Sequence, residues 1–79
     1  MENVCSLMEL KSDEIGVLYR IENLEKAKHK RLIEMGFVSD AKLEVLRKNK
    51  NIVLVGVRGF TLCLDKRLAE AIKVYRGKR

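Results

Sequence analysis

The side chains that could bind a metal ion or transfer a proton are few in this sequence, and they are scattered along it. There is one histidine, His29, within a basic run, and there are two cysteines, Cys5 and Cys63. A metal centre needs several Cys, His, Asp or Glu ligands at fixed offsets. Cys63 and Asp65 make only a single pair, so we expect no metal site, no cofactor and a solvated His29.

Enzymatic chemistry also lacks the residues it needs. A hydrolase or transferase requires converging titratable groups, or a nucleophile beside its base, and neither is visible. The glycines are isolated and lack the GxxxxGK spacing of a phosphate-binding loop: Gly16, Gly36, Gly56 and Gly59. We therefore expect neither catalysis nor nucleotide binding. Arg31 or Arg58 could assist hydrolysis in a partner, but an ordinary surface arginine is the simpler interpretation.

The charge balance favours an acidic partner. Seventeen Lys and Arg against eleven Asp and Glu leave a formal charge of +6, and the excess is concentrated in residues 26–31 and 73–79. Nucleic acid, an anionic membrane surface and an acidic protein face would each suit this charge. Because nothing in the 79 residues marks a linker, we expect one domain over 1–79 with a basic tail at 76–79.

The cellular location follows from what the sequence lacks. No apolar run approaches the roughly 18–20 residues of a membrane span, and the first residues do not resemble a signal peptide. The two cysteines match no disulfide framework. We expect a cytoplasmic protein with free thiols that is associated with a membrane only through its partner.

The elements that position these residues begin with a strand and a helix. Alternating apolar residues predict a half-buried strand: Ile15, Val17, Tyr19 and Ile21. Asn23 can cap a helix from about Leu24 to Met35, which we expect to pack with its basic side in water. Gly36 then provides the left-handed residue that ends the helix. Residues 42–47 form the next strand, and the polar residues 48–51 turn the chain.

The following segment is a hairpin. Residues 52–57 are apolar on both faces, which is typical of a strand that is covered on both sides or exposed at an interaction surface. Gly56 within it suggests a β-bulge. Arg58 and Gly59 turn the chain tightly into a strand that begins with an inward-facing Phe60.

Two short elements complete the domain. Asp65 can cap a helical turn over 66–71, and residues 72–75 form the last strand. The predicted fold is mainly β, a small α+β protein: an SH3-like β-barrel of about five strands with one inserted helix and a short C-terminal helical turn. Full closure of the barrel would leave no exposed edge.

Several segments match a known family. They are Ile33–Val38, Leu43–Arg47 and Val57–Leu62. Together they resemble the ferrous iron transport protein A (FeoA) family, which has a helix followed by leucine or methionine, glycine and phenylalanine, a strand with a polar start, and a Val-Arg-Gly-aromatic turn. The similarity runs from about Leu7 to Val74. Ser39 and Asp40 stand where the family commonly has proline and glycine, which changes the surface beside the helix end.

The resemblance implies a role in iron uptake. FeoA-like proteins are cytosolic partners of the membrane ferrous iron permease that carries a GTP-hydrolysing domain (FeoB type), and they support its transport activity. The permease, rather than this chain, would handle the iron.

We expect the partner-binding residues at the helix end and the Arg-Gly turn: Arg31, Leu32, Met35, Gly36, Phe37, Val38, Arg58 and Gly59. Aromatic, Met and Arg side chains are enriched at interface centres. Phe37 is either exposed at this surface or folded back into the core, and the sequence leaves both open. The face formed by Val53, Val55 and Val57 is a second candidate patch, unless a helix covers it.

Two other functions compete with this one. A basic SH3-like nucleic-acid-binding module is favoured by the charge and the tail. The aromatic content is low, however, and Tyr19 and Phe60 are expected inside, so we expect no nucleic acid partner. The second alternative is a detached relative of the SH3-like domain of metal-dependent repressors. Such a domain normally follows a DNA-binding helical region, for which this sequence has no room.

Overall fold

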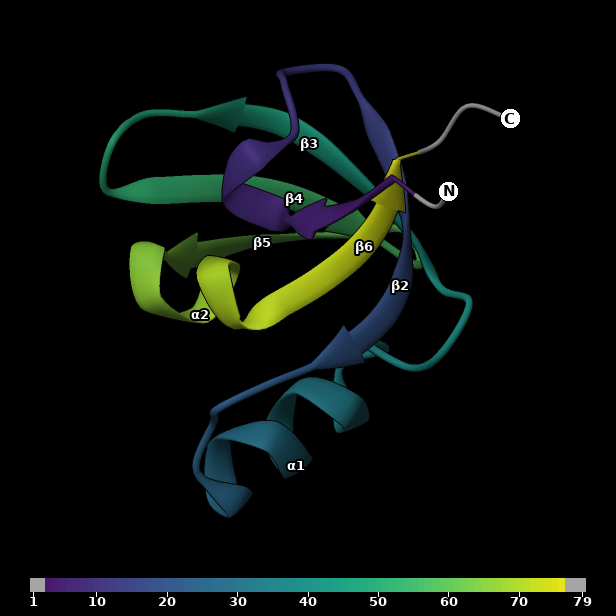
Figure 1. Ribbon diagram of the computed structural model, residues 1–79, viewed down its shortest axis with the longest axis vertical. Coiled ribbons are helices and arrows are strands. Elements are labelled where there is room, and N and C mark those ends of the chain that lie inside the picture. Colours follow the sequence, from purple (N-terminus) through teal and green to yellow (C-terminus); the bar gives the residue numbers. More distant parts are fainter. Residues whose placement is uncertain (1–2, 77–79) are drawn as a thin grey trace.

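The chain forms one coiled antiparallel sheet with short helical segments at its ends and along one side (Figure 1). A computed structural model describes residues 3–76. The strands are β1 (Val4–Ser6), β2 (Ile15–Ile21), β3 (Lys42–Lys48), β4 (Ile52–Val57), β5 (Phe60–Asp65) and β6 (Ile72–Arg76). The helical segments are the 3-10 turn η1 (Leu7–Glu9), α1 (Lys26–Glu34) and α2 (Lys66–Ala71).

The predicted mainly β fold, with a helix after the first predicted strand and a helical turn after the fourth, is confirmed in outline, but the described residues form six strands instead of about five. The additional strand, β1, has only three residues and no alternating pattern, and it exists because it pairs with β6. Strand β6 also extends to Arg76, one residue further than predicted. The rest of the predicted basic tail, 77–79, lies outside the described residues.

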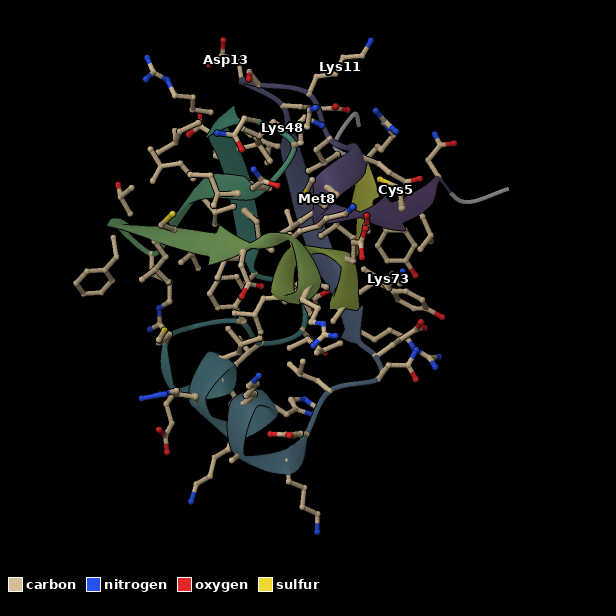
Figure 2. All side chains as sticks on the ribbon, turned by 90° about the vertical axis from the view of Figure 1, so that its left-hand side faces the viewer. Cys5, Met8, Lys11, Asp13, Lys48 and Lys73 are labelled. Atoms are coloured by element: carbon tan, nitrogen blue, oxygen red, sulfur yellow. The ribbon has the colours of Figure 1, made fainter. Side chains whose placement is uncertain are left out.

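The sheet order is β1-β6-β2-β3-β4-β5. No pairing joins β1 to β5 among the described residues, so the expected full closure is wrong and both strands are edges. Lys48, at the end of β3, donates a hydrogen bond to the carbonyl oxygen of Met8 in η1 (Figure 2). This contact holds η1 against the β3–β4 hairpin.

Strand β2 has the predicted bounds but the opposite orientation. Gly16 and Leu18 are buried, whereas Ile15 and Tyr19 are 44% and 41% exposed. A Cβ atom added to Gly16 would lie 2.9 Å from Cγ2 of Val74 on β6. The β2 backbone therefore packs directly on β6, and this close approach selects which face of the strand is inside.

Helix α1 begins at Lys26 instead of Leu24, and Asn23 does not cap it. Asn23 has a φ of 51° and belongs to the preceding turn, while Glu25 occupies the N-cap position without a side-chain hydrogen bond. Leu32 is the only buried residue of the helix. Helix α1 is thus anchored near its C-terminal end and projects from the barrel (Figure 1).

The β3–β4 turn is stabilised by Asn49, whose Oδ1 accepts hydrogen bonds from the backbone N–H groups of Asn51 and Ile52. The predicted bulge at Gly56 is wrong. The register shifts in β3, at Leu46, while Gly56 pairs regularly on both sides. A glycine in a strand is thus not by itself a sufficient signal for a bulge.

The core consists of apolar side chains from the inward faces of the strands, from η1 and from the end of α1. Val53, Val55 and Val57 of β4 are at most 1% exposed. The prediction that these valines form a second interaction patch is therefore wrong, because they belong to the core. Asp65 caps α2 as predicted, since its Oδ1 accepts the backbone N–H of Leu68 at 2.9 Å.

Candidate functional site

The end of α1 is fixed by backbone hydrogen bonds that require a left-handed residue. Gly36 has a φ of 108°, its N–H donates to the carbonyl of Ile33, and the N–H of Phe37 donates to the carbonyl of Leu32, both at 3.0 Å. This is a Schellman motif, which is usually accompanied by an apolar contact across the helix end. Leu32 and Phe37 are 3% and 1% exposed. Phe37 therefore folds into the core.

The eight predicted partner-binding residues divide by exposure. Those on the surface are Arg31, Met35, Val38, Arg58 and Gly59, and those that are buried are Leu32, Gly36 and Phe37. The buried residues hold the helix end in place. Contact with a partner can come only from the exposed ones.

The β4–β5 turn lies against this helix end. Arg58 and Gly59 have φ values of 50° and 82°, as a two-residue hairpin turn of type I′ requires. A Cβ atom on Gly36 would lie 2.5 Å from Cδ of Arg58. The aliphatic part of Arg58 therefore crosses Gly36, and the missing side chain allows the turn and the helix end to meet.

A groove runs between α1 and β5. We call it the α1–β5 groove and define it by these residues: Lys28, Arg31 and Met35 on the helix side, and Arg58, Phe60, Leu62 and Cys63 on the strand side. It consists of two adjoining hollows of about 640 Å³ and about 320 Å³ that share Met35 and Leu62. Figure 2 views the molecule from the side on which β5 runs above α1.

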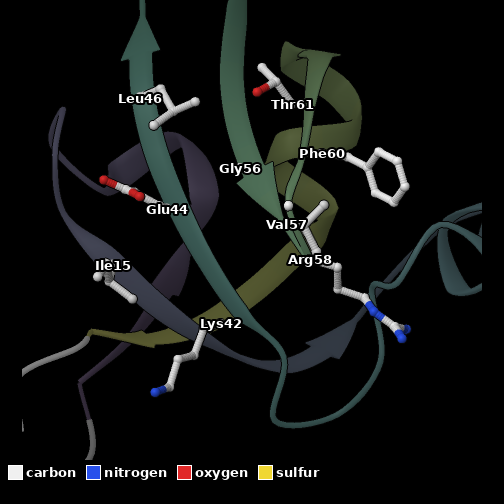
Figure 3. Close-up of a pocket in the computed structure, with 10 residues that line it drawn as sticks. Ile15, Lys42, Glu44, Leu46, Gly56, Val57, Arg58, Phe60 and Thr61 are labelled. Carbon is white, nitrogen blue, oxygen red and sulfur yellow. The ribbon is translucent and has the colours of Figure 1, made fainter.

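Three of the exposed predicted residues, Arg31, Met35 and Arg58, line this groove. Val38 does not line it, although it is 40% exposed. Gly59 lines a different hollow, on the outer face of β3 and β4, where Gly56 leaves space beside Leu46 (Figure 3). The structure therefore brings only part of the predicted set together.

Phe60 is the main residue that the sequence analysis placed wrongly. It was expected inside but is 66% exposed, and it lines the groove. It is the first residue after the two-residue turn, at the end of the hairpin, where it pairs with the buried Val57 but is itself exposed. Its position beside the turn was the signal in the sequence that could have indicated exposure.

The groove has an excess of positive charge. Among the described residues the ion pairs are Arg20–Glu22, at 2.9 Å, and Arg76–Glu14, at 3.1 Å. Lys28, Arg31 and Arg58 take part in neither. The groove's acidic neighbours are Glu34 and Asp65, and Asp65 already caps α2.

The titratable groups on the other side of the barrel have a structural role. A hydrogen bond from the backbone N–H of Lys11, followed by one from Arg76, holds the pKa of Glu14 below its ordinary value. Burial raises the pKa of the Cys5 thiol, which favours its protonated form. Within residues 3–76, no three His, Cys, Asp or Glu side chains are grouped so that they could hold a metal ion.

Two aromatic residues lie on the outer face of β2 and β6. The rings of Tyr19 and Tyr75 have centroids 4.9 Å apart, and the guanidinium carbon of Arg20 is 5.8 Å from the centre of the Tyr19 ring. The expectation that Tyr19 faces inward is therefore wrong. None of the helices in the described part of the chain has the length and apolar character needed to cross a membrane.

Solved structures similar to this chain fall into two groups. The FeoA protein from Chlorobium tepidum is 31% identical with a TM-score of 0.84, over 92% of this chain and 70% of that one. FeoA from Stenotrophomonas maltophilia, solved with zinc, is 26% identical with a TM-score of 0.78, over 87% of each chain, and is described as an SH3 domain protein.

A manganese-dependent transcriptional repressor gives a TM-score of 0.87 at 20% identity, over 98% of this chain and 44% of that one. At this identity the likeness shows the fold alone. A search of curated protein sequences found no significant match. The model of the FeoA domain family matches residues 5–76, which is most of the sequence, and the chain therefore belongs to the FeoA family.

Proposed function

We propose that this protein is a non-catalytic accessory component of ferrous iron uptake that binds a membrane iron permease with a GTPase domain, of the FeoB type, and supports its transport activity. The supporting observation is the α1–β5 groove, in which an exposed methionine and an exposed phenylalanine lie beside arginines that form no ion pair with any described residue. Side chains of these types are enriched at interface centres. The Stenotrophomonas relative is described as a possible activating factor of ferrous iron transport, which agrees with this role.

The chemistry of the described residues supports binding over catalysis. The groove contains no nucleophile paired with a base, and Cys63, its one thiol, lies on an exposed strand. Arg31 and Arg58 are exposed and free of ion pairs among the described residues. This proposal assigns them to contact with the permease and not to assistance in GTP hydrolysis. Iron transfer and GTP hydrolysis belong to the permease.

The test is co-purification of the tagged protein with the full-length permease from the same cell, combined with ferrous iron uptake. Met35→Glu places a charge in the groove and should reduce both the recovered permease and the uptake. Ile33→Glu is the matched control, because Ile33 is 45% exposed on the same helix but lines a different surface. Equal recovery with both variants would contradict docking through the groove, and no recovery with the unaltered protein would contradict the role itself.

The Tyr19–Tyr75 pair, in which Tyr19 is exposed and Tyr75 is partly buried, favours a second candidate function, single-stranded nucleic acid binding. Aromatic rings beside basic residues are the usual platform for stacked bases, and Arg20 and Lys73 are on neighbouring positions of β2 and β6. If oligonucleotides co-purify in place of the permease, and Tyr19→Ala removes them, this function replaces the first one.

A further inference from the structure

Strand β5 is an edge strand with unpaired backbone groups. It pairs with β4 on one side, from Val57 opposite Phe60 to Ile52 opposite Asp65, and no strand of residues 3–76 lies on its other side. In a hairpin, opposite residues alternate between hydrogen-bonded and non-hydrogen-bonded pairs, and after a two-residue turn the first pair, here Val57 and Phe60, is hydrogen-bonded. Thr61 and Cys63 belong to the non-hydrogen-bonded pairs. The N–H and C=O groups of Thr61 and Cys63 therefore point away from β4, and neither residue makes a backbone hydrogen bond outside the ladder in the described part of the chain.

The two edges of the sheet differ in how they are protected. Natural proteins shield edges with very short strands, charges, proline or bulges. Strand β1 has only three residues, and Glu9 accepts the N–H of its last residue, Ser6, at 2.9 Å. Strand β5 is twice as long and carries no charge, proline or glycine from Phe60 to Leu64. This edge is open to an additional strand.

The α1–β5 groove lies directly beside this edge. Cys63, whose backbone is free, lines the groove together with Lys28 and Arg31 of the facing helix. A strand paired with β5 would lie about 4.8 Å from it, and its side chains would alternate between the two faces of the sheet. Those on the groove side would meet Met35 and Leu62, which join the two hollows.

Charge indicates which chain would bind. Lys28, Arg31 and Arg58 carry no ion pair among the described residues, while Glu34 is the one groove carboxylate that is not engaged in a helix cap. An acidic segment would neutralise this excess. A second copy of this chain, with a formal charge of +6, would add to it.

We propose that an extended, acidic segment of the partner protein adds to β5 as a seventh strand, through backbone hydrogen bonds to Thr61 and Cys63, with apolar side chains on Met35 and Leu62. This mode is β-strand addition, in which the backbone provides affinity and the pockets provide specificity. The assignment of the partner as the permease rests on the proposed function, but the surface and its ligand chemistry do not.

The decisive variant is Thr61→Pro. It removes an outward N–H group without touching the bonds to β4, and proline is tolerated at an edge strand in this position. Thr61→Val is the matched control, because it keeps both the N–H group and the β-branched shape. Circular dichroism and thermal unfolding of both variants establish that each one folds.

The first measurement is an NMR titration with a short synthetic peptide of alternating Val and Glu, and with its Val and Lys counterpart. We expect shifts at Thr61, Cys63 and Met35 with the acidic peptide only, roughly tenfold weaker binding by Thr61→Pro, and an effect within about twofold for Thr61→Val. Equal binding of the two peptides, no shift at β5, or equal affinity of the folded Thr61 variants would overturn strand addition.

The second measurement is permease co-purification with the same variants. Loss of the permease with Thr61→Pro alone supports both the surface and the partner. Retention with Thr61→Pro keeps the proposed function and overturns strand addition. Failure of the unaltered protein to retain the permease, with the acidic peptide still bound at β5, overturns the proposed function and keeps the surface.

Discussion

Arg76, near the end of the sequence, contacts three residues close to its start. Its guanidinium group donates to the carboxylate of Glu14 through Nε at 3.1 Å and Nη2 at 3.2 Å, to the carbonyl of Glu9 at 3.5 Å and to Sγ of Cys5 at 3.8 Å. These contacts favour the charged form of Glu14. They attach β6, the last strand, to the loop that precedes β2.

The lowered pKa of Glu14 predicts a pH-dependent contribution to stability. A carboxylate with a depressed folded-state pKa stabilises the fold above its unfolded-state pKa, and this stabilisation is lost as the pH falls through the folded-state value. Glu14→Gln should therefore lower the melting temperature at neutral pH. In strong acid, where Glu14 is protonated, the variant and the unaltered protein should melt alike.

Thermal unfolding across this pH range measures the effect. Glu44→Gln is the control, because Glu44 is exposed on the outer face of β3 and makes no ion pair within the described residues. A difference for Glu14→Gln that does not change with pH would show that its carboxylate is not stabilised by Lys11 and Arg76.

At the scale of elements, α2 depends on its cap. This helix has six residues, and it turns the chain from β5 into β6 while burying Ala69 and Ala71. Its first turn has one side-chain partner in the described structure, the carboxylate of Asp65 on the N–H of Leu68. A short helix has few other interactions to compensate for a lost cap.

Asp65→Ala should destabilise the protein by about 1 kcal/mol, because it leaves this backbone donor without its partner. Asp65→Asn should have a much smaller effect, since the amide oxygen can still accept the hydrogen bond. Urea unfolding followed by circular dichroism distinguishes the two. The prediction fails if the alanine and asparagine variants have the same midpoint.

The sequence predicted the bounds of most strands but not always their orientation. The alternation at Ile15, Val17 and Tyr19 located β2, yet Gly16 faces the core because β6 packs on its backbone. Alternation shows that a strand has two faces. Which face is inside depends on the packing of other strands, and β1 could not be recognised because its pairing with β6 is its main cause.

At the scale of the whole molecule, a chain of 79 residues has little stability to lose. Small domains bury only about 60% of the surface that their unfolded chain exposes. Phe37 is the largest of the fully buried side chains and is 1% exposed, whereas Phe60 is 66% exposed. The two phenylalanines therefore offer a direct comparison of a core residue and a surface residue.

Phe37→Ala should cost about 3–5 kcal/mol, a large part of the roughly 5–15 kcal/mol that stabilises a typical domain. Phe60→Ala should change stability by less than about 0.5 kcal/mol. Thermal and urea unfolding of the two variants provide the comparison. Similar losses for both would mean that Phe60 packs on the fold in solution.

The groove could not be located from the sequence, although the residues of its helix end could. Charge and the lack of catalytic groupings predicted a binding protein, and Met35 and Arg58 were among the residues proposed for partner contact. The groove also needs Lys28, Leu62 and Phe60, and their proximity depends on how α1 projects from the barrel. Gly36 and Arg58 establish that geometry through a contact between segments distant in the sequence.

The pairing of β1 with β6 has a practical consequence for attaching other groups to the chain ends. The N–H of Arg76 donates to the carbonyl of Asn3 at 2.9 Å, so the two ends of the described chain are adjacent, on the side of the barrel opposite α1 (Figure 1). A fusion partner or fluorescent label attached at either end would be on the side of the molecule away from α1. Joining the two ends with a short linker would give a circularly permuted chain whose new termini could be placed in the turn at Asn49.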